Sequence, residues 1–283
     1  MLYRITHQIR YVYSAAVFLE PHVFRLRPRC DAAQQVKEFS MSIEPKPTGR
    51  HDFLDSEENN ATCLWFDELV NSLTVSTLFE VETRGTNPFG YLVTDDAFFQ
   101  LPVHYRDTDA ASLALHLATV DQKSSVYMLA KSVMDDTEGR TIDFLSLLCT
   151  LIYQNYKTEI RLEGPPHPPA ITIEQRRGSC RDFALLYIAA CRSVGLAARF
   201  VSGYQEGVEN MEHPHLHAWA EVYIPGGGWR GYDPTHGLAV SDRHIALAAS
   251  HEPAGAAPVQ GTLRGNDVTA KMDYTISITT IST

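Results

Sequence analysis

The sequence predicts an α+β protein in which an all-β region, a sandwich or a barrel, precedes a core of helices packed on an antiparallel sheet. Three observations carry this prediction. Apolar and polar residues alternate over much of residues 1–100, which is typical of half-buried strands. Helical spacing of apolar residues begins after residue 101, and alternation returns after residue 196. The 283 residues are enough for two domains with separate cores.

The first 100 residues carry the signal of about six short strands. Alternation is clearest from Tyr3 to Tyr13. Shorter runs repeat the pattern at Phe24–Leu26, Phe39–Ile43, Thr62–Phe66 and Leu73–Val81. The clusters EPKPTGRHD, DSEENN and DELVNS between them are rich in turn-forming residues. This succession favours a sandwich or barrel, and because no residue in it points to chemistry, we expect residues 1–100 to have a structural or docking role.

Residues 101–268 are expected to form the second domain, which opens with the linker-like LPVHYRDTD and then with helices. A helix is expected from about Thr141 to Tyr156, because its apolar residues, Cys149 among them, recur on one face of a 3.6-residue repeat. Four prolines in EGPPHPPA, residues 163–170, predict an exposed loop after that helix.

The last third of the chain combines one helix with several strands. The helix is expected to begin at Cys180, and Gly195 is suited to the left-handed position that follows a helix end. Strands are expected in LAARFVSGY, HLHAWAEVYI and WRGYDPTHG. The segment MDYTISITTI, within residues 269–283, alternates strongly and is expected to return as a strand to the N-terminal sheet.

Charge and cysteine content argue against several classes of protein. Lys and Arg number 24 and Asp and Glu 34, and the net charge of −10 speaks against a nucleic-acid partner. The five cysteines are widely spaced and form no CxxC pair, which argues against a disulfide framework and a zinc knuckle. The sequence contains no run of 18 apolar residues, so it predicts no membrane span, and the N-terminus lacks the pattern of a secretory signal. We therefore expect a cytoplasmic protein with no membrane partner.

Cys180 is the candidate nucleophile. It stands at the expected start of a helix, directly after Gly178 and Ser179 and before Arg181. The free N–H groups of a helix N-terminus carry a partial positive charge, which stabilises a thiolate. The same groups can bind the developing oxyanion of a substrate carbonyl. Gly178 would let the neighbouring chain approach closely.

A nucleophilic cysteine needs a base, and the base needs a group that orients it. His217 lies at the beginning of an expected strand, and Asp233 lies at the end of the next one. Adjacent strands can place the carboxylate beside the imidazole, with the helix start opposite them. Cys180, His217 and Asp233 are therefore the expected catalytic residues.

Two other interpretations remain open on the residues alone. In the first, His213, His215 and His217 point to one side of a strand and bind a metal with Cys180 or Asp233, although Pro214 disturbs the pairing. In the second, the protein is a catalytically silent binding or scaffold protein with the same fold.

The motif R-x-G-x-C-R-D-F-A at Arg176–Ala184 and the string from Gly203 to Gly237, with HAWxEVYxPGxGW and DPTxG, resemble the bacterial transglutaminase-like proteins. These belong to the transglutaminase/papain-like cysteine protease superfamily. The resemblance implies an N-terminal β-domain followed by a papain-like core.

For the site, the resemblance implies Cys180 as nucleophile, His217 as general base and then acid, and Asp233 as the group that orients the imidazole. The implied reaction is attack on a peptide or protein amide through a thioester, without a cofactor. The sequence leaves hydrolysis by a protease or amidase and transfer to an amine by a transglutaminase equally open.

Two features of the sequence leave substrate recognition open. SHEPAGAAP, residues 250–258, lacks the arginine, tyrosine and second acid that relatives tend to carry, although Glu252 keeps one carboxylate. A side-chain donor to the oxyanion would come from upstream of the cysteine, where Gln154, Asn155 and Tyr156 are the candidates.

Overall fold

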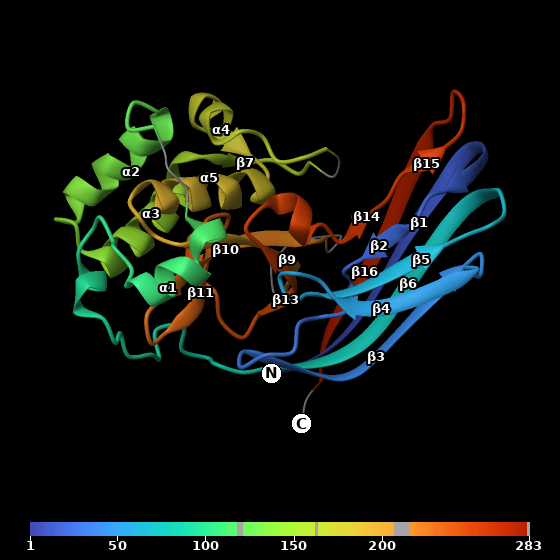
Figure 1. Cartoon of the computed structure of the whole chain (residues 1–283), viewed down its shortest axis with the longest axis horizontal. Coiled ribbons are helices and arrows are strands. Elements are labelled where there is room, and N and C mark those ends of the chain that lie inside the picture. The colour runs from blue at the N-terminus through green and yellow to red at the C-terminus, as the bar shows by residue number, and fades with distance from the viewer. Residues whose placement is uncertain (118–120, 162–163, 207–214, 282–283) are drawn as a thin grey trace.

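Long antiparallel strands form one half of the molecule and a helix-covered sheet forms the other in the computed structural model, which describes residues 1–117, 121–161, 164–206 and 215–281 (Figure 1). The N-terminal half contains two sheets that share one apolar core. The larger runs in the order β15-β1-β6-β3, with β16 paired to β1. Its strands are β1 (Leu2–Leu19), β3 (Gln34–Glu44), β6 (Val70–Thr83), β15 (Leu263–Arg264) and β16 (Ala270–Ile281). The smaller runs in the order β14-β2-β5-β4, with β2 (His22–Phe24), β4 (Gly49–Leu54), β5 (Asn60–Trp65) and β14 (Val259–Gln260).

Two details of the N-terminal region differ from the sequence prediction. β1 is longer than the alternation at Tyr3–Tyr13, because it runs from Leu2 to Leu19 over 18 residues. The cluster EPKPTGRHD is also not a turn throughout, because its last four residues open β4, which pairs with β5 from Gly49↔Trp65 to Leu54↔Asn60. Ladder hydrogen bonds with a neighbouring strand outweigh the local turn preference there.

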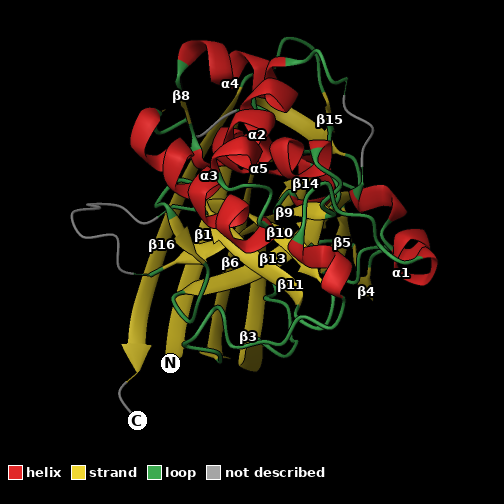
Figure 2. Cartoon of the chain, turned by 90° about the vertical axis from the view of Figure 1, so that its left-hand side faces the viewer, coloured by secondary structure: helices red, strands yellow, loops and turns green. Residues whose placement is uncertain are grey.

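The second half is a five-stranded antiparallel sheet covered by helices, which stack together in front of the strands in Figure 2. The strand order is β12-β11-β10-β9-β13, with β9 (Ala198–Gln205), β10 (His217–Ile224), β11 (Gly228–Asp233), β12 (Leu238–Ala239) and β13 (His244–Ser250). The α-helices are α1 (Asp107–Ser112), α2 (Ser125–Asp136), α3 (Thr141–Asn155), α4 (Pro169–Gln175) and α5 (Cys180–Ser193). Short elements complete this half: η1 (Asp96–Phe99), η2 (Ala114–His116), β7 (Lys157–Thr158), β8 (Arg177–Gly178) and η3 (Pro253–Ala256).

The helix α5 forms the centre of this half, where it packs against β9 and β10. The apolar stripe expected on it is buried: Phe183, Leu186, Tyr187, Ala190 and Cys191. The alternate residues of β10 that meet it are Ala218, Ala220, Val222 and Ile224. Gly195 follows the helix with a φ of 83°, as its place in the sequence predicts. The packing therefore fixes where α5 begins relative to β10.

The helix expected at Thr141–Tyr156 is α3, which ends one residue earlier. The loop expected at residues 163–170 is shorter than predicted, because α4 begins at Pro169; Glu163 lies outside the described residues. Proline suits the first position of a helix, since its φ is already helical and no hydrogen bond is lost there.

Contacts between the two halves link residues on both sides of the domain boundaries expected near residues 100 and 268. Val93 and Phe98 pack with the helical core. β14 and β15 pair with β2 and β1 of the N-terminal sheets, and β16 pairs with β1 along Ala270–Ile281. The fold is α+β, and no helix in the described part of the chain is long and apolar enough to cross a membrane.

Candidate active site

Cys180 is the first residue of α5, and the residues around it fix its place tightly. Ser179 donates its backbone N–H and its hydroxyl to Oδ2 of Asp182, at 2.7 and 2.8 Å. Gly178 is needed for this approach, because a Cβ there would lie 2.9 Å from Cβ of Asp182 and 3.2 Å from the ring of Phe183. The thiol is half-buried. The N–H of Cys180 belongs to the first helical turn, which has no acceptor within the helix.

Asp182 also fastens a neighbouring loop to the start of α5. Its fully buried carboxylate accepts hydrogen bonds at Oδ1 from Nη2 of Arg161 and the backbone N–H of His167, each at 2.6 Å. Arg181 donates to the carbonyls of Gly164 and Arg161, again at 2.6 Å. Burial alone would raise the pKa of Asp182, but these hydrogen bonds hold it below its usual value. The carboxylate is therefore ionised and ties the loop beside Cys180.

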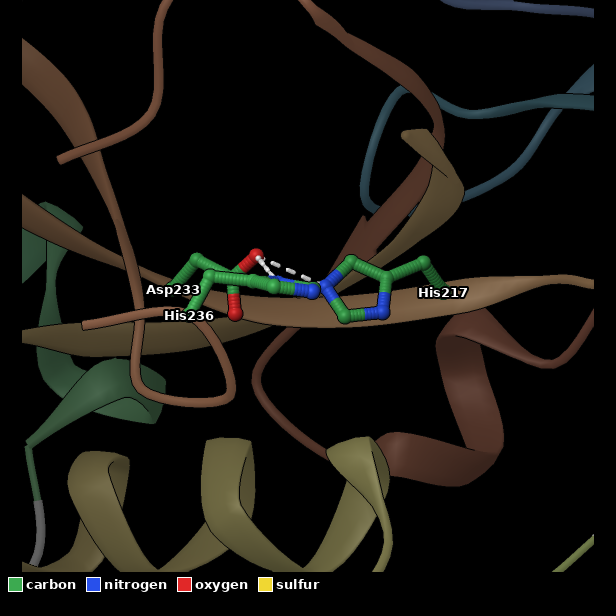
Figure 3. Close-up of side chains that lie close together, drawn as sticks. All are labelled: His217, Asp233 and His236. Atoms are coloured by element: carbon green, nitrogen blue, oxygen red, sulfur yellow. Dashed lines mark hydrogen bonds and ion pairs between the residues drawn. The ribbon is translucent and has the colours of Figure 1, made fainter. Parts of the chain in front are cut away.

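His217 and Asp233 meet across adjacent strands, at the start of β10 and the end of β11 (Figure 3). Nε2 of His217 donates to Oδ2 of Asp233 at 2.7 Å, and both side chains are buried. Burial alone would lower the pKa of His217, but the charge and hydrogen bond of Asp233, followed by a hydrogen bond with Cys180, raise it to about 10. The charge and hydrogen bond of His217, followed by hydrogen bonds from two further histidines, hold the pKa of Asp233 well below its usual value against the effect of burial. The structure thus brings the three predicted residues together around the His217 ring.

Two further histidines, His236 and His244, converge on Asp233, and sequence reasoning missed both. Nδ1 of His236 lies 2.9 Å and Nε2 of His244 lies 3.1 Å from Oδ2, the oxygen that His217 also contacts. The backbone N–H of Thr235 donates to Oδ1 at 2.9 Å. Burial lowers the pKa of His244, so its ring is neutral. His236 stands in the DPTHG string, which was the one sequence signal available for it.

The metal hypothesis is not supported in the form in which the sequence suggested it. His213 lies outside the described residues, and His215 donates Nδ1–H to the carbonyl of Leu216 at 2.8 Å, away from Asp233. A different trio, His217, Asp233 and His236, has its polar atoms within 4.8 Å of one another. Those atoms already form hydrogen bonds to each other, which accounts for their closeness.

The described contacts of the candidate oxyanion donors do not include the thiol of Cys180. Asn155 donates its amide to the carbonyl of Leu151 in its own helix, Gln154 is exposed, and the ring of Tyr156 packs edge-on against Phe183. The structure singles out none of the three as the donor.

The segment 250–258 lies at the other end of α5 from Cys180. Arg192, near the C-terminus of α5, donates to the carbonyl of His251, and twelve residues of helix between Arg192 and Cys180 span about 18 Å. The segment also packs on Glu57 of the N-terminal region, which accepts from Ser250 at 3.0 Å. Its divergence from relatives therefore does not alter the immediate surroundings of the thiol.

Comparison with known proteins agrees with this architecture. Residues 3–82 match the bacterial transglutaminase-like N-terminal region, and residues 127–234 match the transglutaminase-like superfamily. Residues 127–234 therefore form a transglutaminase-like core domain. An uncharacterised protein of Mycobacterium leprae is 24% identical to this transglutaminase-like chain over 292 residues, 99% of each protein. A protein-glutamine gamma-glutamyltransferase of Pseudomonas aeruginosa is 36% identical over 73 residues, 23% of this chain and 11% of that one.

A solved structure shares the fold of the whole transglutaminase-like chain. It is a candidate cysteine protease from Cytophaga hutchinsonii, which superposes with a TM-score of 0.76 at 22% identity and covers 100% of this chain and 91% of its own. At this identity the likeness concerns the fold alone.

Proposed function

We propose that the protein catalyses thiol-dependent acyl chemistry on peptide or protein amides, with Cys180 as nucleophile, His217 as general acid and base, and Asp233 as the group that orients the imidazole. The observation that carries the proposal is the His217 ring, which bonds the ionised Asp233 at Nε2 and is paired with Cys180. Members of the transglutaminase-like superfamily are usually enzymes of this kind, cysteine proteases or transglutaminases.

The reaction follows from the geometry in two stages. The Cys180 thiolate attacks the amide carbonyl, and the oxyanion is stabilised by the free N–H groups at the start of α5. The C–N bond then breaks as the His217 imidazolium gives its proton to the leaving amine, and a thioester remains on Cys180. In the second stage water or an amine attacks the thioester, gives its proton to His217 and releases the thiolate. Water yields hydrolysis, and an amine yields a new amide.

The test uses a second cysteine of the same molecule as its control. Cys30 is exposed and lies in the N-terminal region, whereas Cys180 is paired with His217. At about pH 6, below the range in which an ordinary thiol ionises, iodoacetamide should alkylate Cys180 at least tenfold faster than Cys30, as measured by peptide mass mapping. The His217→Gln variant should lose this difference.

Trapping then identifies the reaction. Incubation with a peptide library and acid quenching should leave a thioester-linked acyl group on Cys180, detected by mass, and none in the Cys180→Ala variant. Equal reactivity of Cys30 and Cys180 with no acyl adduct would instead leave a catalytically silent binding protein. Amide turnover that survives Cys180→Ala would exclude Cys180 as the nucleophile.

A further inference from the structure

Three imidazole rings from three parts of the chain share one carboxylate oxygen. His217 comes from β10, His236 from the turn after β11 and His244 from β13, and their nitrogens lie 2.7, 2.9 and 3.1 Å from Oδ2 of Asp233. Because the carboxylate is ionised and can only accept, each ring must carry its hydrogen on the nitrogen that faces it. Figure 3 shows His217 and His236 directed at Asp233 from different sides.

The arrangement divides the charge of the carboxylate among its donors. A hydrogen bond from a neutral ring disperses part of the negative charge, so less of it is available to hold the proton on His217. His236 and His244 therefore oppose the effect of Asp233 on His217. The proposed reaction needs this opposition, because His217 must surrender its proton when the amine leaves.

We propose that His236 and His244 are positioning residues of the acyl-transfer site, which hold the Asp233 carboxylate in place and limit how firmly it retains the proton of His217. This inference rests on the proposed function. It assigns different tasks to the two rings, because the His244 side chain is 2% exposed whereas that of His236 is 23% exposed. His244 fixes the carboxylate from inside, and His236 links it to solvent.

Among the described residues, the titratable groups that face the pair are Cys180 from α5, beside His217, and Cys149 from α3, His236 and His244 around Asp233. The buried thiol of Cys149 stays neutral, since burial raises its pKa. The ring of His244 also packs edge-on against Trp219, with 5.2 Å between ring centroids, which holds its orientation. Within the described part of the chain, Nδ1 of His244 has no partner, so the bond to Asp233 is the one polar contact of that ring.

The two histidines allow a reciprocal test, because they use different nitrogens. His236 donates from Nδ1, which the amide of asparagine can replace, and His244 donates from Nε2, which the longer glutamine can replace. His236→Asn and His244→Gln should therefore keep the donor, whereas His236→Gln, His236→Leu, His244→Asn and His244→Leu should lose it.

The readout is the titration of His217 itself. NMR of protein with ¹³C-labelled histidine monitors this titration, and the His217→Gln variant identifies the signal of His217. The two donor-keeping variants should titrate like the wild type. In the donor-losing variants the midpoint should move upward by about half a pH unit, roughly a threefold gain in proton affinity. Amide turnover should fall in the same variants, and thermal unfolding monitors their folding.

The outcomes separate this inference from the proposed function. A midpoint that stays unchanged in every folded variant overturns the inference, and so does the same ranking of asparagine and glutamine at both positions. The titration needs no substrate, so a wild-type protein that turns over no amide refutes the proposed function while the titration still decides the role of the two histidines.

Discussion

Burial and charge strongly alter the environment of His217, and this has a consequence for stability. Its pKa rises from 6.5 to about 10 in the folded protein, because the charge and hydrogen bond of Asp233 and then Cys180 outweigh burial, which alone would lower it. The folded protein therefore holds a proton that the unfolded chain releases above about pH 6.5. Stability gained in this way is fully present below that pH and is lost as the pH rises through the folded value.

We expect the free energy of unfolding to fall between pH 6.5 and about 10 in the wild type, and to fall less in Asp233→Asn. Urea denaturation across that range measures the slope in both proteins. Cys180→Ala serves as the control for the thiol, which lies beside His217. Parallel slopes in the wild type and Asp233→Asn would contradict the charge pairing of His217 with Asp233.

At this scale the sequence predicted part of the site. The sequence was sufficient to predict Cys180, His217 and Asp233, because each stands at the end of an element whose place could be inferred from periodicity and turns. His236 and His244 were not, since a single histidine in a turn or a strand carries no pattern. Their meeting depends on the turn after β11 and on the pairing of β13 with β9, which no local signal specifies.

Among the elements, α5 was the easiest to predict and is the most important for the site. Its apolar stripe and Gly195 gave both ends of the helix. β4 was missed because glycine, arginine, histidine and aspartate carry little strand preference, and its partner β5 supplies the order. The loop beside Cys180 was expected at residues 163–170, but its attachment to Asp182 was missed, since the donors are Arg161 and a backbone N–H.

The Asp182→Ala variant tests how much the start of α5 depends on this carboxylate. We expect Asp182→Ala to destabilise the protein by about 3 to 5 kcal/mol, because it removes the buried acceptor shared by Arg161 and the donors of Ser179 and His167. Urea denaturation measures the loss. Alkylation of Cys180 should slow in the folded variant, because the loop and the first turn are no longer tied together. Asp143→Ala is the matched control, an acidic residue in the first turn of α3 with an exposed side chain, and should cost far less.

For the whole molecule, the contact between the halves is the feature that composition could not reveal. Nδ1 of His7 in β1 lies 2.8 Å from the hydroxyl of Tyr204 in β9, and both side chains are buried. Asn59, before β5, exchanges two hydrogen bonds with the backbone of Ala249 in β13, each at 2.8 Å. The N-terminal sheets therefore support the sheet that carries His217.

Because His7 is buried at the contact between the two halves, we expect acid to weaken this contact. Burial lowers its pKa from 6.5 to about 4, so the folded protein keeps the ring neutral while the unfolded chain binds a proton below about pH 6.5. The unfolding free energy should therefore decline as the pH falls from 6.5 toward 4.

His7→Phe provides the comparison for that decline. It should be less stable near pH 8, because Tyr204 loses its partner, yet should show a flatter profile in the acid range. Urea midpoints at several pH values measure this, and an equally steep acid decline in the variant would assign the effect to other groups.

The pairing of β16 with β1 links the completion of the N-terminal sheet to the synthesis of residues 270–281. β1 lies between β6 and β16, and its residues from Leu2 to Tyr13 bond to Ile281 through Ala270. At about 5 to 20 residues per second, the ribosome needs on the order of ten to fifty seconds to deliver that partner after β1 has emerged. During this interval one edge of β1 presents unpaired backbone groups to other nascent chains.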